Sequence, residues 1–163
     1  MKKKIYEYFA HPVFKYKVKD YSNHNKLLEK YIYQLQKEDP SGQKRSNIGG
    51  WHSPFFDLNN STSVGYKFLA ELQPYIVDVF KSYGWSYNSQ KVFYSGMWAI
   101  INKKGNSNTE HIHPNSNLSA AYYVKAPERG GDFLVSNPHS ICRNSFPVRE
   151  NPTELNRLIA KHK

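Results

Sequence analysis

Residues 108–124 read NTEHIHPNSNLSAAYYV, and the interpretation of the whole chain starts from this stretch. His111 and His113 are two positions apart, so on an extended strand both side chains point to one side and can meet one cation. Imidazole suits iron, zinc, copper and nickel. A metal site needs at least three ligands, so the pair fits equally well two surface or turn histidines before Pro114.

The segment after the histidines predicts a β-structure. Leu118–Lys125 is rich in β-forming residues, and further short strands are expected at residues 91–94, 96–102 and 132–136. Several short strands at close spacing indicate an antiparallel sandwich or barrel. The β core is expected to cover about residues 91–140.

A helical part is predicted before this core, over about residues 20–84. Ser22 is expected to cap the first helix, which ends with the turn residues Asp39–Gly42. A second apolar stripe of helical spacing predicts a helix over about residues 62–83, which Pro74 should kink or divide in two.

The remaining segments predict a strand near the start of the chain and a helix at its end. Apolar and polar residues alternate over residues 9–19, which indicates a strand with one buried face. A short C-terminal helix is expected over about residues 152–162 because Pro152 and Glu154 are typical of a helix start. All of these elements are expected to form a single domain, residues 1–163.

Composition narrows the class of protein. Aromatic residues make up 15% of the 163 residues, which argues against disorder, and no stretch is apolar enough to cross a bilayer. The single cysteine, Cys142, excludes an internal disulfide and fits a cytoplasmic protein. A formal net charge of +10 could indicate a nucleic-acid partner, but the basic residues are spread along the chain without a reading motif.

Taken together, the motifs resemble the iron(II)- and 2-oxoglutarate-dependent oxygenases of marine bacteria and their phages. Each motif is modest alone, but the order and spacing agree over roughly residues 8–140. The matching segments are Phe9–Val13, Ser46–Ser53, Trp98–Asn102, His111–Pro114, Leu118–Val124 and Gly131–Pro138.

The resemblance implies a double-stranded β-helix, the jelly-roll (cupin-like) barrel, that binds Fe(II) and 2-oxoglutarate and usually hydroxylates its substrate. Such proteins commonly hold iron with two histidines and one carboxylate. His111 matches the first ligand, and His113 stands where the acid is expected, so a three-histidine site or rotation of Glu110 into the site both stay open. The resemblance also places Asn102 and Tyr123 at the cosubstrate, although structural hydrogen bonding would explain them as well.

The sequence departs from this pattern at the C-terminal side. A distal histidine with a later arginine that binds the cosubstrate carboxylate is not found, and neither His139 nor His162 has the expected surroundings. The chain therefore resembles a member shortened at its C-terminus, and the barrel is expected to be incomplete. It could be completed by a second chain, form a homo-oligomer, or be a non-catalytic remnant or binding module.

Other functions stay open at this point. A basic nucleic-acid-binding protein and a three-histidine dioxygenase of the cupin type that needs no 2-oxoglutarate are the alternatives. Trp51 and Trp98 could line a substrate cleft, although large rings more often lie in the core. The substrate cannot be read, because this fold serves many substrates.

Overall fold

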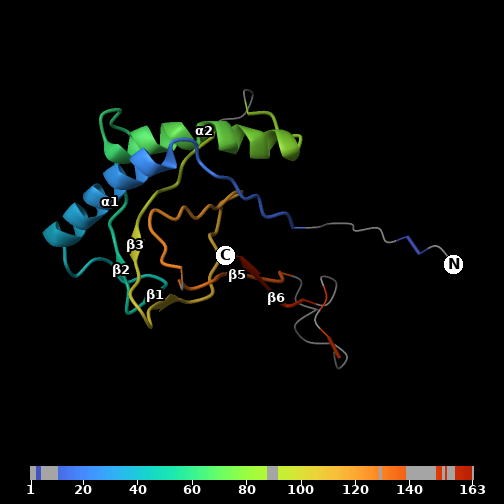
Figure 1. The fold of residues 1–163 in the computed structure, drawn as a ribbon. Helices are drawn as coiled ribbons and strands as arrows, with labels where there is room; N and C mark the ends of the chain where they lie inside the picture. Colours follow the sequence, from blue (N-terminus) through green and yellow to red (C-terminus); the bar gives the residue numbers. More distant parts are fainter. Residues whose placement is uncertain are drawn as a thin grey trace. The chain divides into compact units, whose positions relative to one another are not determined.

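The computed structural model describes residues 3–4, 11–87, 92–128, 130–138, 150–151, 153 and 157–162, with the backbone alone for His162. The chain divides into two compact units, Met1–Lys125 and Ala126–Lys163. The first unit holds both helices and two pairs of short strands, and the second holds one pair (Figure 1). The prediction of a single domain over residues 1–163 is not tested by this division and stays a prediction.

Helix α1 spans Tyr21–Glu38 and confirms the first predicted helix. Its N-cap is Asp20, not Ser22 as predicted; Asp20 has a positive φ of 51° and makes no side-chain cap hydrogen bond. The predicted turn follows the helix, because the Asp39 carboxylate accepts hydrogen bonds from the Ser41 hydroxyl (2.7 Å) and the Gly42 backbone N–H (3.1 Å). These bonds lower the pKa of Asp39 below its ordinary value near 3.8.

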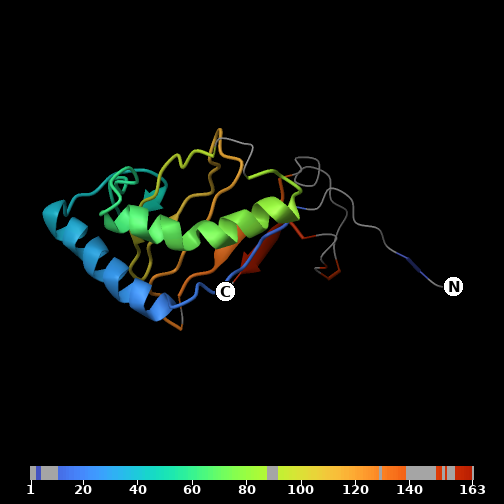
Figure 2. The same ribbon diagram turned by 90° about the horizontal axis from the view of Figure 1, so that it is seen from above.

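Helix α2 spans Val64–Ser82 and confirms the second predicted helix. Ser63 caps it, since the Ser63 hydroxyl oxygen accepts from the Tyr66 backbone N–H at 3.0 Å. Of the two predicted effects of Pro74, division of the helix is wrong, because the helix continues through this residue, whereas a kink stays a prediction. Figure 2, which looks onto α2 from above, shows it as one uninterrupted element beside α1. Gly84 follows the helix with a φ of 69°, as expected for a residue that ends one.

The predicted strand over residues 9–19 is wrong for its described part, residues 11–19, which pairs with no strand there. The alternation nevertheless identified side chains that make contacts. The Phe14 ring packs on the Tyr83 ring with centroids 5.8 Å apart, and the Tyr16 ring packs on the Tyr75 ring with centroids 5.3 Å apart. The Tyr16 hydroxyl also donates to the Asp78 carboxylate at 2.7 Å. The backbone groups of a helix are bonded within the helix, so a segment packed on it cannot form a strand ladder with it.

Two antiparallel strand pairs form the β part of the first unit. β1 (Asn47–Ile48) pairs with β4 (Ser107–Asn108), and β2 (Trp51–His52) pairs with β3 (Ile100–Ile101). Further backbone hydrogen bonds extend each pair at one end: Thr109 to Ser46 (2.8 Å) continues the pairing of β1 with β4. Ser53 to Ala99 (2.9 Å) and Phe56 to Met97 (2.8 Å) continue the pairing of β2 with β3. Gly49, with a φ of 74°, makes the bend between β1 and β2.

The predicted β core is realised only in part. Residues 100–101 and 133–136 are strands within two of the predicted segments, whereas residues 92–94 and Leu118–Lys125 are not strands. The Leu118–Lys125 segment is instead held by side chains of α1, because the Tyr122 hydroxyl donates to Asn25 (2.6 Å) and Lys125 pairs with Glu29 (2.7 Å). The described residues form helices with short antiparallel strand pairs, and no closed barrel is found among them.

The buried core of the first unit lies between α1 and the strand pairs. Trp51, Phe56 and Ala99 form its centre, and the Trp51 indole N–H donates to the Asp39 carbonyl oxygen at 2.8 Å. The expectation that Trp51 is a core ring is confirmed. Partly buried side chains from α1, from β3 and from the segments next to the strands surround this centre: Tyr31, Ile32, Leu35, Leu58, Met97 and Ile101.

In the second unit, β5 (Phe133–Ser136) pairs antiparallel with β6 (Ile159–His162). The strand at residues 132–136 is thus confirmed over 133–136, but the C-terminal helix predicted over 152–162 is wrong at residues 159–162. The four residues of β6 form a backbone ladder with β5, and such pairing outweighs a weak local preference for helix. Among the described residues no helix is long and apolar enough to span a bilayer.

Candidate functional site

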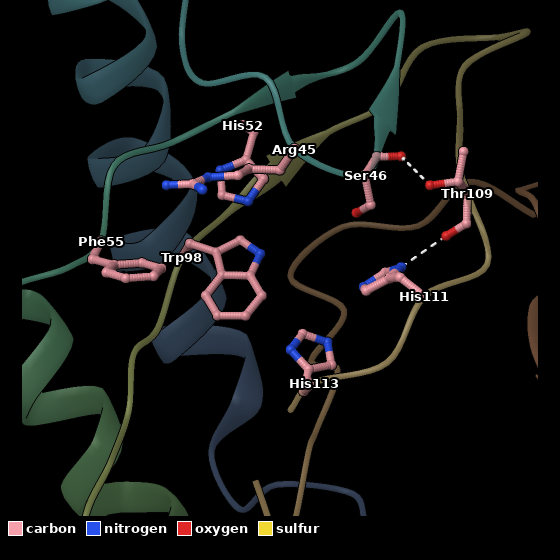
Figure 3. A pocket seen from close by; sticks show the side chains of 8 residues that line it. All are labelled: Arg45, Ser46, His52, Phe55, Trp98, Thr109, His111 and His113. Atoms are coloured by element: carbon pink, nitrogen blue, oxygen red, sulfur yellow. Dashed lines mark hydrogen bonds between the residues drawn. The ribbon is translucent and has the colours of Figure 1, made fainter. Parts of the chain in front are cut away.

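A pocket of about 600 Å³ lies in the first unit, beside the two strand pairs (Figure 3). The pocket combines basic, hydroxyl and aromatic side chains from the turn before β1, from the chain around β2 and β3, and from the segment after β4. Its lining residues are Arg45, Ser46, His52, Phe55, Trp98, Thr109, His111 and His113.

Both histidines of the His-x-His motif line this pocket, and their ring centroids are 5.0 Å apart with the rings steeply inclined. His111 Nδ1 lies 2.7 Å from the backbone carbonyl of Thr109 (Figure 3). A carbonyl oxygen only accepts, so Nδ1 of the neutral ring carries the proton and Nε2 keeps its lone pair. Thr109 is itself fixed, because its N–H donates to the carbonyl oxygen of Ser46.

His113 is oriented by an aromatic stack. Its ring lies on the Trp98 indole, with centroids 5.6 Å apart and planes 29° apart. The His52 imidazole also stacks on this indole, with ring centroids 5.7 Å apart and planes 13° apart. Trp98 is half-buried and lines the pocket. Of the two interpretations of this residue, lining a cleft therefore fits better than a place in the core.

Sequence reasoning missed the role of His52 in this pocket. His52 is buried, with 3% of its surface exposed, and its Nδ1 lies 2.6 Å from the carbonyl oxygen of Ser53. His52 and His113 both stack on the Trp98 indole, but no three His, Cys, Asp or Glu side chains gather to hold a metal ion in the described part of the chain, so His52 is not a third ligand beside His111 and His113. No spacing signal could have found it, because His52 reaches the pocket only through the pairing of β2 with β3.

The other residues singled out for the site lie elsewhere. Asn102 and Tyr123 are not among the lining residues; the Asn102 amide donates to the Asn108 side chain at 3.0 Å, and Tyr123 is 56% exposed. Glu110 does not line the pocket either. His139 lies outside the described residues, and His162 closes strand β6, where the sequence suggested helical surroundings. The assignments of Asn102 and Tyr123 to a cosubstrate stay predictions.

The chemistry of the two imidazoles suits a metal that prefers nitrogen ligands, because the Nε2 lone pair of His111 is available next to the His113 ring. Within the described part of the chain, however, no three His, Cys, Asp or Glu side chains gather to hold a metal ion. His111 and His113 are therefore two candidate ligands, and a third ligand is not found among the described residues.

Comparison with known families supports one class of protein for this region. Residues 96–161 match the family model described as "Putative 2OG-Fe(II) oxygenase". The matched stretch contains Trp98, His111 and His113, and it supports the iron(II)/2-oxoglutarate oxygenase family, for which a jelly-roll fold and these cofactors are expected. Searches of curated proteins and of solved structures found no match.

Proposed function

We propose that this protein is an Fe(II)- and 2-oxoglutarate-dependent dioxygenase of the hydroxylase type. The observation that carries the proposal is the convergence of His111 and His113 on one pocket, inside the stretch that matches the oxygenase family. The substrate stays open. We also propose a cytoplasmic location, for which the single cysteine is the supporting observation.

His111 and His113 would hold the iron as imidazole ligands in this proposal. Bound iron(II) with 2-oxoglutarate would supply dioxygen activation. The backbone carbonyl of Thr109 holds the His111 ring in the tautomer that a metal ligand needs, and Trp98 holds the His113 ring by stacking. Such positioning reduces the entropy that the ligands lose when a metal binds.

The rings of Phe55 and Trp98 form an apolar wall of the pocket. The ring centroids of Phe55 and Trp98 are 5.6 Å apart, and both rings line the pocket beside the histidines. Apolar walls exclude water from the neighbourhood of a metal ligand and contact the carbon skeleton of a bound molecule. We propose that the substrate lies on these rings.

An anaerobic titration with Fe(II) and 2-oxoglutarate tests the proposal. A weak visible charge-transfer band is expected for the intact protein, and oxygen should then convert 2-oxoglutarate to succinate. His111→Ala and His113→Ala should each abolish the band, whereas His11→Ala, outside the pocket, should leave it unchanged. A protein that binds Fe(II) and 2-oxoglutarate without the band, or variants that keep it, would contradict the proposal.

A non-catalytic binding module of the same family is the second candidate. It is favoured by one observation, the lack of a three-ligand cluster among the described residues. This candidate predicts that the protein folds without metal and forms no succinate in oxygen, although its pocket still binds small molecules.

A further inference from the structure

The pocket has an unbalanced set of charges. Its lining residues include one guanidinium, from Arg45, and three imidazoles, but no Asp or Glu occurs among them in the described part of the chain. Of the two hydroxyl groups that line it, that of Thr109 already donates to the Ser46 carbonyl oxygen at 3.3 Å. The Ser46 hydroxyl oxygen accepts from the Asn108 side-chain amide at 3.2 Å, and its own proton can be donated to a ligand. Cationic and donor groups without a neighbouring carboxylate favour an anionic ligand.

Arg45 is the permanent charge in this set, because guanidinium stays protonated throughout the physiological range. Its side chain meets only the neutral Gln43 amide oxygen, at 3.4 Å, and makes no ion pair with any other described residue. Its backbone is fixed, since the Arg45 N–H donates to the Asn47 side chain at 2.8 Å. The guanidinium is therefore free to pair with a ligand from a fixed place at the start of β1.

The guanidinium lies beside the aromatic part of the pocket. Arg45, Phe55 and Trp98 all line the pocket, and Figure 3 draws the Arg45 guanidinium on the side of the view where the Phe55 and Trp98 rings lie. Phe55 is 59% exposed, so much of its ring is available for contact. An anionic group and an apolar surface next to each other fit a ligand that carries a carboxylate on a carbon skeleton.

We propose that Arg45 is the carboxylate-binding residue of this pocket, and that the pocket takes small organic carboxylates. Guanidinium binds a carboxylate through two parallel hydrogen bonds, which lysine cannot reproduce. The proposal rests on the proposed function only in taking this pocket as the active site. Arg45 lies outside the family match at residues 96–161, so the match carries no information on it. The carboxylate could belong to the substrate or to 2-oxoglutarate.

Calorimetric titration of the metal-free protein tests the proposal with three probes. Phenylacetate presents a carboxylate with an aromatic skeleton, phenylacetamide is its neutral counterpart, and 2-oxoglutarate is the cosubstrate of the supported family. Phenylacetate is expected to bind at least tenfold more tightly than phenylacetamide, since a charge-assisted bidentate pair is lost in the amide.

Arg45 variants then assign the binding to this residue. R45M should weaken the binding of the carboxylate probes by about tenfold or more, and R45K should recover only part of the loss. Lys44→Met is the matched control, because Lys44 is the exposed neighbouring cation and does not line the pocket. Because Arg45 is exposed, R45M should keep the melting temperature of the parent protein, which a thermal melt checks.

The outcomes separate the two sources of the carboxylate. Loss of 2-oxoglutarate binding in R45M would assign Arg45 to the cosubstrate, and loss confined to phenylacetate would assign it to the substrate. Three results would overturn the proposal. The parent protein and R45M could bind both carboxylate probes with equal affinity, the parent protein could bind phenylacetate and phenylacetamide equally, or it could bind neither carboxylate. The titration contains no iron and does not depend on oxygen, so its failure is distinct from a failure of the succinate assay.

Discussion

Ser53 and Ala99 are joined by two hydrogen bonds, from the Ser53 backbone N–H to the Ala99 carbonyl oxygen and from the Ala99 N–H to the Ser53 hydroxyl oxygen, both 2.9 Å long. Ser53 is fully buried, with 0% of its surface exposed. Its hydroxyl therefore takes the place of a backbone acceptor where the pairing of β2 and β3 ends.

Ser53→Ala should lower the free energy of unfolding by about 1–3 kcal/mol, because the buried Ala99 N–H loses its acceptor. Chemical denaturation of the purified variant measures the change. Ser61→Ala, at an exposed position, is the control and should change stability by less than about 0.5 kcal/mol. A stability of S53A equal to that of the control would show that the N–H finds another partner.

Gly65→Ala should destabilise the protein although alanine is the better helix former. A β-carbon at this buried position in the first turn of α2 would lie 2.8 Å from Cβ of Phe56 and 3.0 Å from the backbone oxygen of Asp57. Neither atom can move away by a side-chain rotation, so overpacking of about 1–3 kcal/mol should outweigh a helix gain of about 1 kcal/mol. Thermal melts of G65A and of Gly131→Ala, a site with open space, measure the difference.

Asp39→Asn should change the acid stability of the protein. The pKa of Asp39 is lowered in the folded state by its hydrogen bonds to Ser41 and Gly42, so the stabilisation is present above the ordinary carboxyl value and is lost as the pH falls through the folded pKa. D39N should therefore be less stable than the parent protein at neutral pH, and the difference should shrink toward about pH 2.

Denaturant midpoints at the two pH values measure this effect. Glu128→Gln removes an exposed carboxylate in the second unit and is the control. A difference between D39N and the parent protein that stays constant with pH would mean that packing, and not the charge of Asp39, is responsible.

Trp98→Leu should weaken divalent metal binding to the two histidines by about tenfold, because the stack that orients His113 is removed. Binding of Co(II), followed by its visible absorption, measures the loss. Trp85→Leu is the matched control, since Trp85 stacks on Tyr83 beyond the end of α2 and does not line the pocket. Equal affinity of the two variants would show that Trp98 does not position the site.

The helices could be predicted from the sequence because their stabilisation is local or follows from one apolar stripe. The spacing of the apolar residues predicted both helices to within a few residues, and Gly84 indicated where α2 ends. The alternation at residues 11–19 also indicated a packed face correctly. It could not tell whether a sheet or a helix covers that face, because a side-chain pattern does not reveal the backbone partner.

The strands were harder to predict because each needs a partner far away in the sequence. Leu118–Lys125 has strand composition but binds α1 through Tyr122 and Lys125, and β6 forms where the local pattern favoured a helix. The site shows the same division. The spacing of His111 and His113 predicts that they meet, whereas His52 and Arg45 join them through strand pairing that no local motif encodes.

The pairing of the chain before α2 with the chain after it also determines when the pocket can form. The Ser53–Ala99 bond joins residues 46 positions apart and the Asn108–Ser46 bond joins residues 62 apart, and all of α2 lies within both intervals. Contacts of such long range close late in folding, because loop entropy is lost before they form. During synthesis on the ribosome, the imidazole pair and the guanidinium can therefore meet only once the segment after β4 has emerged, when both helices have already left the exit tunnel.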